Sequence, residues 1–185
     1  MDIHQLYTLV AEDQQAVATL IRQRLHSDVV LINQVSEYII NSGGKRLRPV
    51  LVLLSAGAFG YRGSFHHELA AVVEFIHTAT LLHDDVVDES DMRRGKETAN
   101  NVWGNAPSVL VGDFLYSRAF QMMINVKSMR VMEILSEATN IIAEGEVMQL
   151  LNVHNADLDE AGYLEVIRYK TAKLFESASQ LGAVI

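Results

Sequence analysis

The sequence predicts an all-α fold, and three observations support this prediction. Apolar residues recur at intervals of three and four along most of the chain, which gathers them on one face of a helix. Strand-like alternation of apolar and polar residues is rare, and there are only two prolines among 185 residues. No repeat and no linker rich in glycine, proline or serine divides the chain. We therefore expect residues 1–185 to form a single helical unit.

The apolar pattern also predicts where the helices begin and end. A Gly-Gly pair at 43–44 stops the second segment, and Pro49 suits the first turn of the third. The helical segments predicted from the pattern are 3–25, 29–40, 48–59, 65–91, 107–127, 129–152 and 159–182. The connectors predicted between them are 60–63, 95–106 and 154–157.

Composition excludes several classes of function. The formal charge is 15 − 23 = −8 with no clustered basic face, which disfavours nucleic acids and anionic membranes as partners. The absence of cysteine removes disulfides and thiol nucleophiles and favours the cytoplasm. The first ten residues lack the features of a signal peptide, and apolar runs such as 49–59 are too short to span a bilayer. We expect a soluble protein.

Three aspartates interrupt a stretch that is otherwise apolar on nearly every face. Residues 69–87 are typical of a buried helix, yet they include Asp84 and Asp85, and Asp88 follows directly. Asp84 and Asp88 are four residues apart and share one helix face. Carboxylates withdrawn from water need a cationic partner, and hard oxygen ligands favour Mg²⁺. The alternative is a solvated acidic turn at the helix end.

Two basic clusters accompany the aspartates. Arg93 and Arg94 follow the acidic cluster closely, and guanidinium groups bind phosphate oxygens with bidentate geometry. Lys45 and Arg48 follow the Gly-Gly pair at the start of the next helix, where backbone N–H groups favour an anion. This arrangement predicts a diphosphate cradle, although a simple helix stop with basic capping residues remains open.

Together these motifs resemble the trans-polyprenyl diphosphate synthases. The resemblance rests on residues 43–49, 76–88, 93–95 and 170–171, in this order, and extends from about residue 34 to the end. It implies an isoprenoid-synthase helical bundle around a central cavity. It also implies a Mg²⁺-dependent prenyltransferase, active as a homodimer, that condenses an allylic diphosphate such as farnesyl diphosphate with successive isopentenyl diphosphate units. The small residues described below imply a long all-trans product.

The resemblance also implies roles for individual residues. The residues implied to hold Mg²⁺ against the allylic diphosphate are Asp84, Asp85 and Asp88. Arg93 is implied to bind the same diphosphate, and Lys170 and Thr171 are implied to stabilise the leaving group and the developing cation, with Gln149 on the same wall. The residues implied to bind isopentenyl diphosphate are Lys45, Arg48, His77 and Arg94.

Product length has a steric interpretation. Ala79 and Thr80 lie one turn before Asp84, and bulky aromatic residues at these positions stop chain growth early in the family. Their small size implies a long tunnel and a long prenyl product. Met123, or its neighbour Met122, is a candidate for the tunnel floor, with ordinary core packing as the alternative.

One part of the family pattern is missing. Members carry a second aspartate-rich motif on a later helix, and no such set follows Asp91. The final residues, 171–185, remain periodic and apolar. We expect an N-terminal portion of a synthase domain that is weakly active or inactive by itself. A non-catalytic subunit of such a synthase is the alternative.

Two other metal-dependent classes share short motifs with this chain. His83-Asp84 is typical of HD phosphohydrolases, which need further His and Asp ligands, for which only His77 and His154 are candidates. Glu74-x-x-His77 is typical of a di-iron helix, but no second Glu-x-x-His occurs. Neither set of ligands is complete in the sequence.

Overall fold

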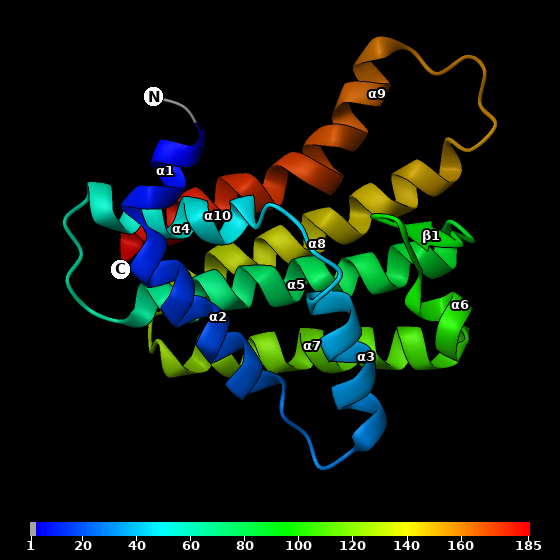
Figure 1. The fold of residues 1–185 in the computed structure, drawn as a ribbon. Coiled ribbons are helices and arrows are strands. Elements are labelled where there is room, and N and C mark those ends of the chain that lie inside the picture. Colours follow the sequence, from blue (N-terminus) through cyan, green and yellow to red (C-terminus); the bar gives the residue numbers. More distant parts are fainter. Residues whose placement is uncertain (1–2) are drawn as a thin grey trace.

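A computed structural model describes residues 3–185, so residues 1–2 of the predicted unit lie outside the described part. Helices account for nearly all of the fold (Figure 1). The first half contains α1 (Ile3–Leu9), α2 (Ala11–Leu25), α3 (Val30–Ile40), α4 (Leu47–Ala58) and α5 (Phe65–Val87). The second half contains β1 (Met92–Arg93), β2 (Lys96–Glu97), α6 (Ala99–Trp103), α7 (Asn105–Asn125), α8 (Met129–Leu151), α9 (Glu160–Ile167), a π-helix (Arg168–Ala172) and α10 (Lys173–Val184). The prediction of an all-α fold is confirmed.

Helix α5 is the centre of the bundle. It packs against α2, α3, α4, α6, α7 and α10, and Figure 1 shows it running through the middle of the molecule. Apolar side chains along its middle, such as Phe75 and Ile76, are completely buried. Burial on so many sides explains why the sequence of α5 is apolar on nearly every face. Any charged group on this helix must therefore lie at a cavity or beside a counter-charge.

Helix α10 returns across the bundle and packs closely on α4. A Cβ atom on Gly182 would lie only 2.4 Å from the carbonyl oxygen of Val52 and 2.7 Å from the nitrogen of Ala56. Glycine at this position thus lets two helix backbones approach. This contact brings the C-terminal helix beside the loop that precedes α4, where the first basic cluster lies.

Several predicted elements differ from the structure. The predicted helix 3–25 is two helices that meet at Val10, and the predicted helix 65–91 ends at Val87. The predicted connector 95–106 contains β2, α6 and the start of α7. Arg94 and Gly95 both have positive φ angles, of 53° and 77°, and these form the tight turn that pairs β1 with β2. An arginine in this conformation is not a usual hairpin signal.

The predicted helix 159–182 is interrupted by a π-helix at Arg168–Ala172. The wider turn of a π-helix shifts the helix faces by only about one residue, a change too small for the apolar pattern to reveal. Among residues 3–185, no helix combines the length and apolar character that crossing a membrane requires.

Candidate active site

A cavity of about 360 Å³ lies between α5, α7 and α8. Most of its wall is apolar, and acidic side chains gather in one part of it. The lining residues contributed by α5 are Ile76, Thr80, His83, Asp84 and Val87, and those from α7 and α8 are Asp113, Tyr116, Thr139, Ile142, Ala143 and Glu146. An apolar cavity with a few convergent charged groups is the usual form of a small-molecule site.

Asp84 and Glu146 share one ammonium group at this cavity. Lys170 Nζ lies 2.7 Å from Glu146 Oε2 and 3.7 Å from Asp84 Oδ2. Burial, together with the nearby Glu146, raises the pKa of Asp84 to about 6, against the opposing effect of Lys170. Burial alone would lower the pKa of Lys170, but Glu146 and Asp84 raise it overall. The site thus carries more negative charge than one ammonium group balances.

The π-helix determines where Lys170 lies. It inserts between α9 and α10 and packs on α8. A Cβ atom on Gly145 would lie 2.7 Å from the backbone nitrogen of Lys170, so glycine is needed for this approach. Because Glu146 follows Gly145 directly, the same contact brings its carboxylate to the ammonium group. π-Helical turns of this kind are common at functional sites.

The three motif aspartates occupy different environments. Asp84 faces the cavity, and Asp88 is exposed at the C-cap of α5. Asp85 has a side chain only 1% exposed, and it accepts hydrogen bonds from Arg93 Nε and Nη2 at 2.7 to 3.0 Å. These bonds raise the pKa of Arg93. The Asp85 carboxylate is thus directed at Arg93.

A second cavity, of about 430 Å³, lies between the start of α4, the middle of α5 and the hairpin turn. It brings together all four residues implied to bind isopentenyl diphosphate. The lining residues are Gly44, Lys45, Arg46, Leu47, Arg48, Glu74, His77, Arg94 and Phe175. Four of these side chains are cationic, and together they attract a polyanion strongly. They are Lys45, Arg46, Arg48 and Arg94.

Arg48 is held in this cavity by two neighbours. Its Nη1 atom donates to His77 Nε2 at 3.1 Å, and its guanidinium carbon lies 4.3 Å from the centre of the Phe175 ring. Burial, followed by the positive charges of Arg48 and Arg94, lowers the pKa of His77 to about 3. The His77 ring is therefore neutral near pH 7 and accepts at Nε2.

Glu74 is a buried carboxyl group in the same cavity. Burial raises its pKa although Arg46, Arg48 and Arg94 act in the opposite direction. Its Oε2 atom has no hydrogen-bond partner in the described part of the chain. Among the described residues, no group of potential metal ligands includes Glu74 or His77, so the structure gives no support to the di-iron interpretation.

Backbone conformation brings the basic cluster to the cavity. Gly43, Gly44 and Arg46 all have positive φ angles, which turn the chain sharply between α3 and α4. A Cβ atom on Gly44 would lie 2.5 Å from Arg94 Nη1, so the glycine lets the Arg94 guanidinium approach this turn. The separate motifs at 43–49 and 93–95 thereby meet at one place.

Of the remaining predicted residues, only some line a cavity. Thr80 lines the apolar cavity, whereas Ala79 and Met123 are fully buried in the core and do not line it. Thr171 is exposed, and Gln149 is half-buried outside the cavities described above. Their roles stay predictions. Sequence reasoning missed Glu146 and Phe175 and considered Glu74 only as part of a di-iron pattern, because nothing in the local sequence shows which cavity these side chains reach.

The acidic end of the first cavity fits a hard divalent cation. Asp84 faces the cavity and Asp88 is exposed to solvent, and burial together with the nearby Glu146 raises the pKa of Asp84. Mg²⁺ is commonly held by one or two carboxylates, with waters and substrate phosphates completing its coordination. Asp84 and Asp88 suit this arrangement, because they would supply two carboxylate ligands and leave other coordination positions to waters and substrate phosphates.

An all-helical bundle with an acidic apolar cavity beside a cationic one defines a protein of the isoprenoid-synthase type. The chain belongs to the polyprenyl synthetase family, whose model matches residues 29–185. It is 56% identical over 185 residues to octaprenyl diphosphate synthase of Escherichia coli, covering 100% of this chain and 57% of the relative. It is 46% identical over 177 residues to a nonaprenyl diphosphate synthase of Rhodobacter capsulatus, covering 95% of this chain and 54% of the relative.

Solved structures are similarly close. A polyprenyl synthase of Caulobacter crescentus, complexed with calcium and isoprenyl diphosphate, matches with a TM-score of 0.97 and 51% identity, over 99% of this chain and 56% of that one. A decaprenyl diphosphate synthase of Rhodobacter capsulatus matches with a TM-score of 0.94 and 54% identity, over 98% of this chain and 56% of that one. The chain therefore spans about half the length of the relatives it matches.

Proposed function

We propose that this chain carries the allylic and isopentenyl diphosphate sites of a Mg²⁺-dependent trans-polyprenyl diphosphate synthase. The observation that carries the proposal is the pair of cavities on α5, one acidic and apolar around Asp84, the other cationic around Arg48. The allylic chain would occupy the first cavity and the diphosphate of isopentenyl diphosphate the second. Both reacting groups would then lie along one rigid helix, which favours the reaction by orientation.

The cationic groups of the chain stabilise the leaving diphosphate. Arg93, oriented by Asp85, and the Lys170 ammonium group supply positive charge beside Asp84. Mg²⁺, when bound by Asp84 and Asp88, supplies further positive charge to the diphosphate. The allylic C–O bond then breaks, and the diphosphate leaves with the bonding electron pair.

The second substrate completes the reaction. Its double bond attacks the allylic cation and forms the new C–C bond, and a proton is then lost to the released diphosphate as the new double bond forms. Lys45, Arg48, Arg94 and neutral His77 hold this substrate by its diphosphate. The apolar wall, which includes Ile76 and Ile142, keeps water from the cation.

The relatives guide the finer assignment. The likeness to octaprenyl diphosphate synthase of Escherichia coli supports an octaprenyl product, which would serve as a quinone side chain. The primer would be an allylic diphosphate such as farnesyl diphosphate. Thr80 at the cavity wall leaves room for a growing chain, and we keep Ala79 and Met123 as candidates for limiting its length. We further propose a homodimer located in the cytoplasm.

Metal-dependent substrate binding tests this function directly. We expect farnesyl diphosphate or a bisphosphonate to bind the purified chain in the presence of Mg²⁺, and to bind much more weakly after EDTA treatment. Asp84→Ala should abolish this metal dependence. The matched control is Asp91→Ala, which removes an exposed carboxylate just beyond the cluster and should bind like the wild type. Binding that needs no metal, or that Asp84→Ala leaves unchanged, would contradict the proposal.

An elongation assay separates the remaining possibilities. Extending farnesyl diphosphate with labelled isopentenyl diphosphate and sizing the extracted product would measure both activity and product length. Binding without elongation would identify an inactive portion of a synthase. Absence of both binding and elongation would identify a non-catalytic subunit and overturn the proposed function.

A further inference from the structure

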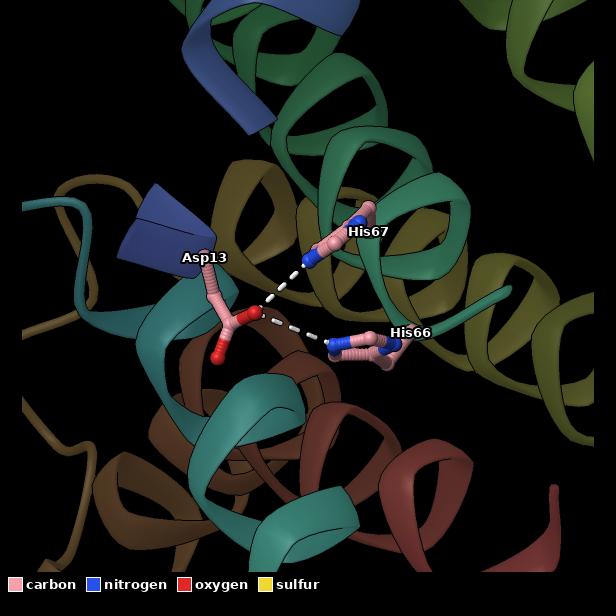
Figure 2. A group of neighbouring side chains, drawn as sticks. All are labelled: Asp13, His66 and His67. Carbon is pink, nitrogen blue, oxygen red and sulfur yellow. Dashed lines mark hydrogen bonds and ion pairs between the residues drawn. The ribbon is translucent and has the colours of Figure 1, made fainter. Parts of the chain in front are cut away.

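A second polar cluster lies at the opposite end of α5 from Asp84. Asp13 in α2 faces His66 and His67, which belong to the first turn of α5 (Figure 2). His67 and Asp84 are 17 residues apart on this helix, which corresponds to about 25 Å. The cluster is therefore far from the acidic cavity, and none of its three residues lines either cavity of the proposed synthase site.

Three potential metal ligands converge in this cluster. The Nε2 atoms of His67 and His66 lie 2.8 and 3.3 Å from the same Asp13 oxygen, Oδ1, and Figure 2 shows both rings directed at it. All three ligand atoms lie within 4.8 Å of one another. Among the side chains that the structure describes, which begin at Gln5, this is the only group of three His, Cys, Asp or Glu residues that meets this criterion.

We propose that Asp13, His66 and His67 bind a divalent transition metal ion of the zinc class. Zinc takes imidazole nitrogen and carboxylate oxygen ligands at about 2.0 to 2.1 Å, so neighbouring ligands of a tetrahedral site lie about 3.3 Å apart. The distance from His66 Nε2 to Asp13 Oδ1 is already 3.3 Å, and that from His67 needs to lengthen by about 0.5 Å. Two imidazoles with one carboxylate select zinc-like ions over Mg²⁺.

Packing holds the two histidine rings in position. The His66 and His67 rings pack with centroids 3.9 Å apart, and Tyr61 packs against His66 in a T-shaped arrangement. Both Nε2 atoms therefore meet Asp13 Oδ1 before any ion binds.

The present contacts within the cluster are hydrogen bonds. One Asp13 oxygen meets both rings, and His66 Nδ1, which is not the ring nitrogen that faces Asp13, is buried without a hydrogen-bond partner in the described part of the chain. A metal ion at the three converging atoms would replace the two hydrogen bonds to Asp13 with three coordinate bonds.

Solvent can reach the open side of the site. The Asp13 side chain is 38% exposed, and a polar groove of α2 and α5 that includes Glu12, Ser64 and His67 lies alongside. Water can therefore supply a fourth ligand. Because the protein ligands come from two helices, the ion would link α2 to α5 and stabilise the folded chain.

Cobalt and zinc binding test the proposal. The purified 185-residue chain, stripped with EDTA, would be titrated with Co²⁺ and followed by visible absorption, then with Zn²⁺ in excess Mg²⁺, with calorimetric and thermal readouts. We expect one ion per chain, tetrahedral cobalt bands and a rise in Tm with Zn²⁺. Asp13→Asn and His67→Gln should each weaken Zn²⁺ binding at least tenfold and remove the rise in Tm.

Controls separate this site from others. His26→Gln removes an exposed histidine, and Asp84→Ala removes the main carboxylate of the synthase site, so both variants should retain zinc binding at this cluster. The Tm of each variant without metal shows whether it folds. The proposal is overturned if zinc fails to bind in excess Mg²⁺, if Asp13→Asn and His67→Gln bind it normally, or if only Asp84→Ala loses it. The first result would leave the cluster as a hydrogen-bonded link between helices.

Discussion

Arg93 holds the buried Asp85 carboxylate through both Nε and Nη2, at distances of 2.7 to 3.0 Å. Asp84, the preceding residue, faces the apolar cavity. Adjacent residues of one motif thus point in different directions, because successive positions on a helix are about 100° apart. We infer that Asp85 acts mainly by orienting Arg93, while Asp84 and Asp88 are the better candidates for metal ligands.

Removing Asp85 should therefore affect stability more than removing Asp84. Asp85→Ala leaves the partly buried Arg93 guanidinium unpaired, and we expect it to lower the free energy of unfolding by about 2 to 3 kcal/mol. Asp84→Ala removes a carboxylate whose charge is already poorly compensated and should change stability by about 1 kcal/mol or less. Urea denaturation of both variants without metal checks this. Equal losses of stability would contradict the different environments described above.

Replacing Gly145, which lies where α8 contacts the π-helix, should destabilise the protein. Gly145→Ala places a methyl group 2.7 Å from the Lys170 nitrogen, so the π-helix must shift. We expect a loss of about 1 to 3 kcal/mol of stability and weaker binding of an allylic diphosphate. The matched control is Gly57→Ala in α4, where a Cβ atom meets nothing within 4 Å. This control should raise stability by about 0.5 to 1 kcal/mol, because alanine favours the helix.

His77 should make the protein less stable in acid. Its folded pKa is about 3, below the ordinary value of 6.5. Above pH 6.5 the ring is neutral in both states, but between pH 6.5 and 3 the unfolded chain binds a proton that the folded protein does not. This one group should therefore lower the free energy of unfolding by about 1.4 kcal/mol per pH unit as pH falls through that range.

The variant His77→Gln should flatten this part of the stability profile. Denaturation measured from pH 7.5 to 3.5 would compare its slope with that of the wild type. The raised pKa of Glu74 acts in the opposite direction and is retained by the variant, so the comparison isolates His77. His26→Gln, at an exposed position, should keep the slope of the wild type. Parallel curves for His77→Gln and the wild type would show that His77 is protonated without penalty.

Replacement by phenylalanine should have different effects at Thr80 and at Ala79. Thr80 lines the cavity, so Thr80→Phe should fold and should reduce the affinity for farnesyl diphosphate more than for shorter allylic diphosphates. Ala79 is 0% exposed in the core, so Ala79→Phe should lower stability by several kcal/mol through overpacking, roughly 3 or more. Calorimetric titration with allylic diphosphates of increasing length checks the first expectation, and thermal denaturation checks the second. A stable Ala79→Phe variant with shortened ligand preference would restore Ala79 as the length-limiting residue.

Periodicity was enough to predict the helical class and most helix positions, because an apolar stripe has the same spacing wherever the helix lies. The motifs could also be recognised from short stretches of sequence. Gly-Gly followed by basic residues, and aspartates within an apolar helix, have chemical consequences that hold before any tertiary contact is known. The family resemblance rested on these same segments.

Other features depended on contacts between distant segments. Asp84 and Glu146 line one cavity from different helices, and the π-helix places the Lys170 ammonium group in contact with both. Asp13 meets His67 across 54 positions of sequence, although neither belongs to a recognisable motif. Burial likewise directed Asp85 to Arg93 and left Ala79 in the core. The direction of a side chain and its distance from partners remote in sequence arise from packing, which local sequence patterns do not encode.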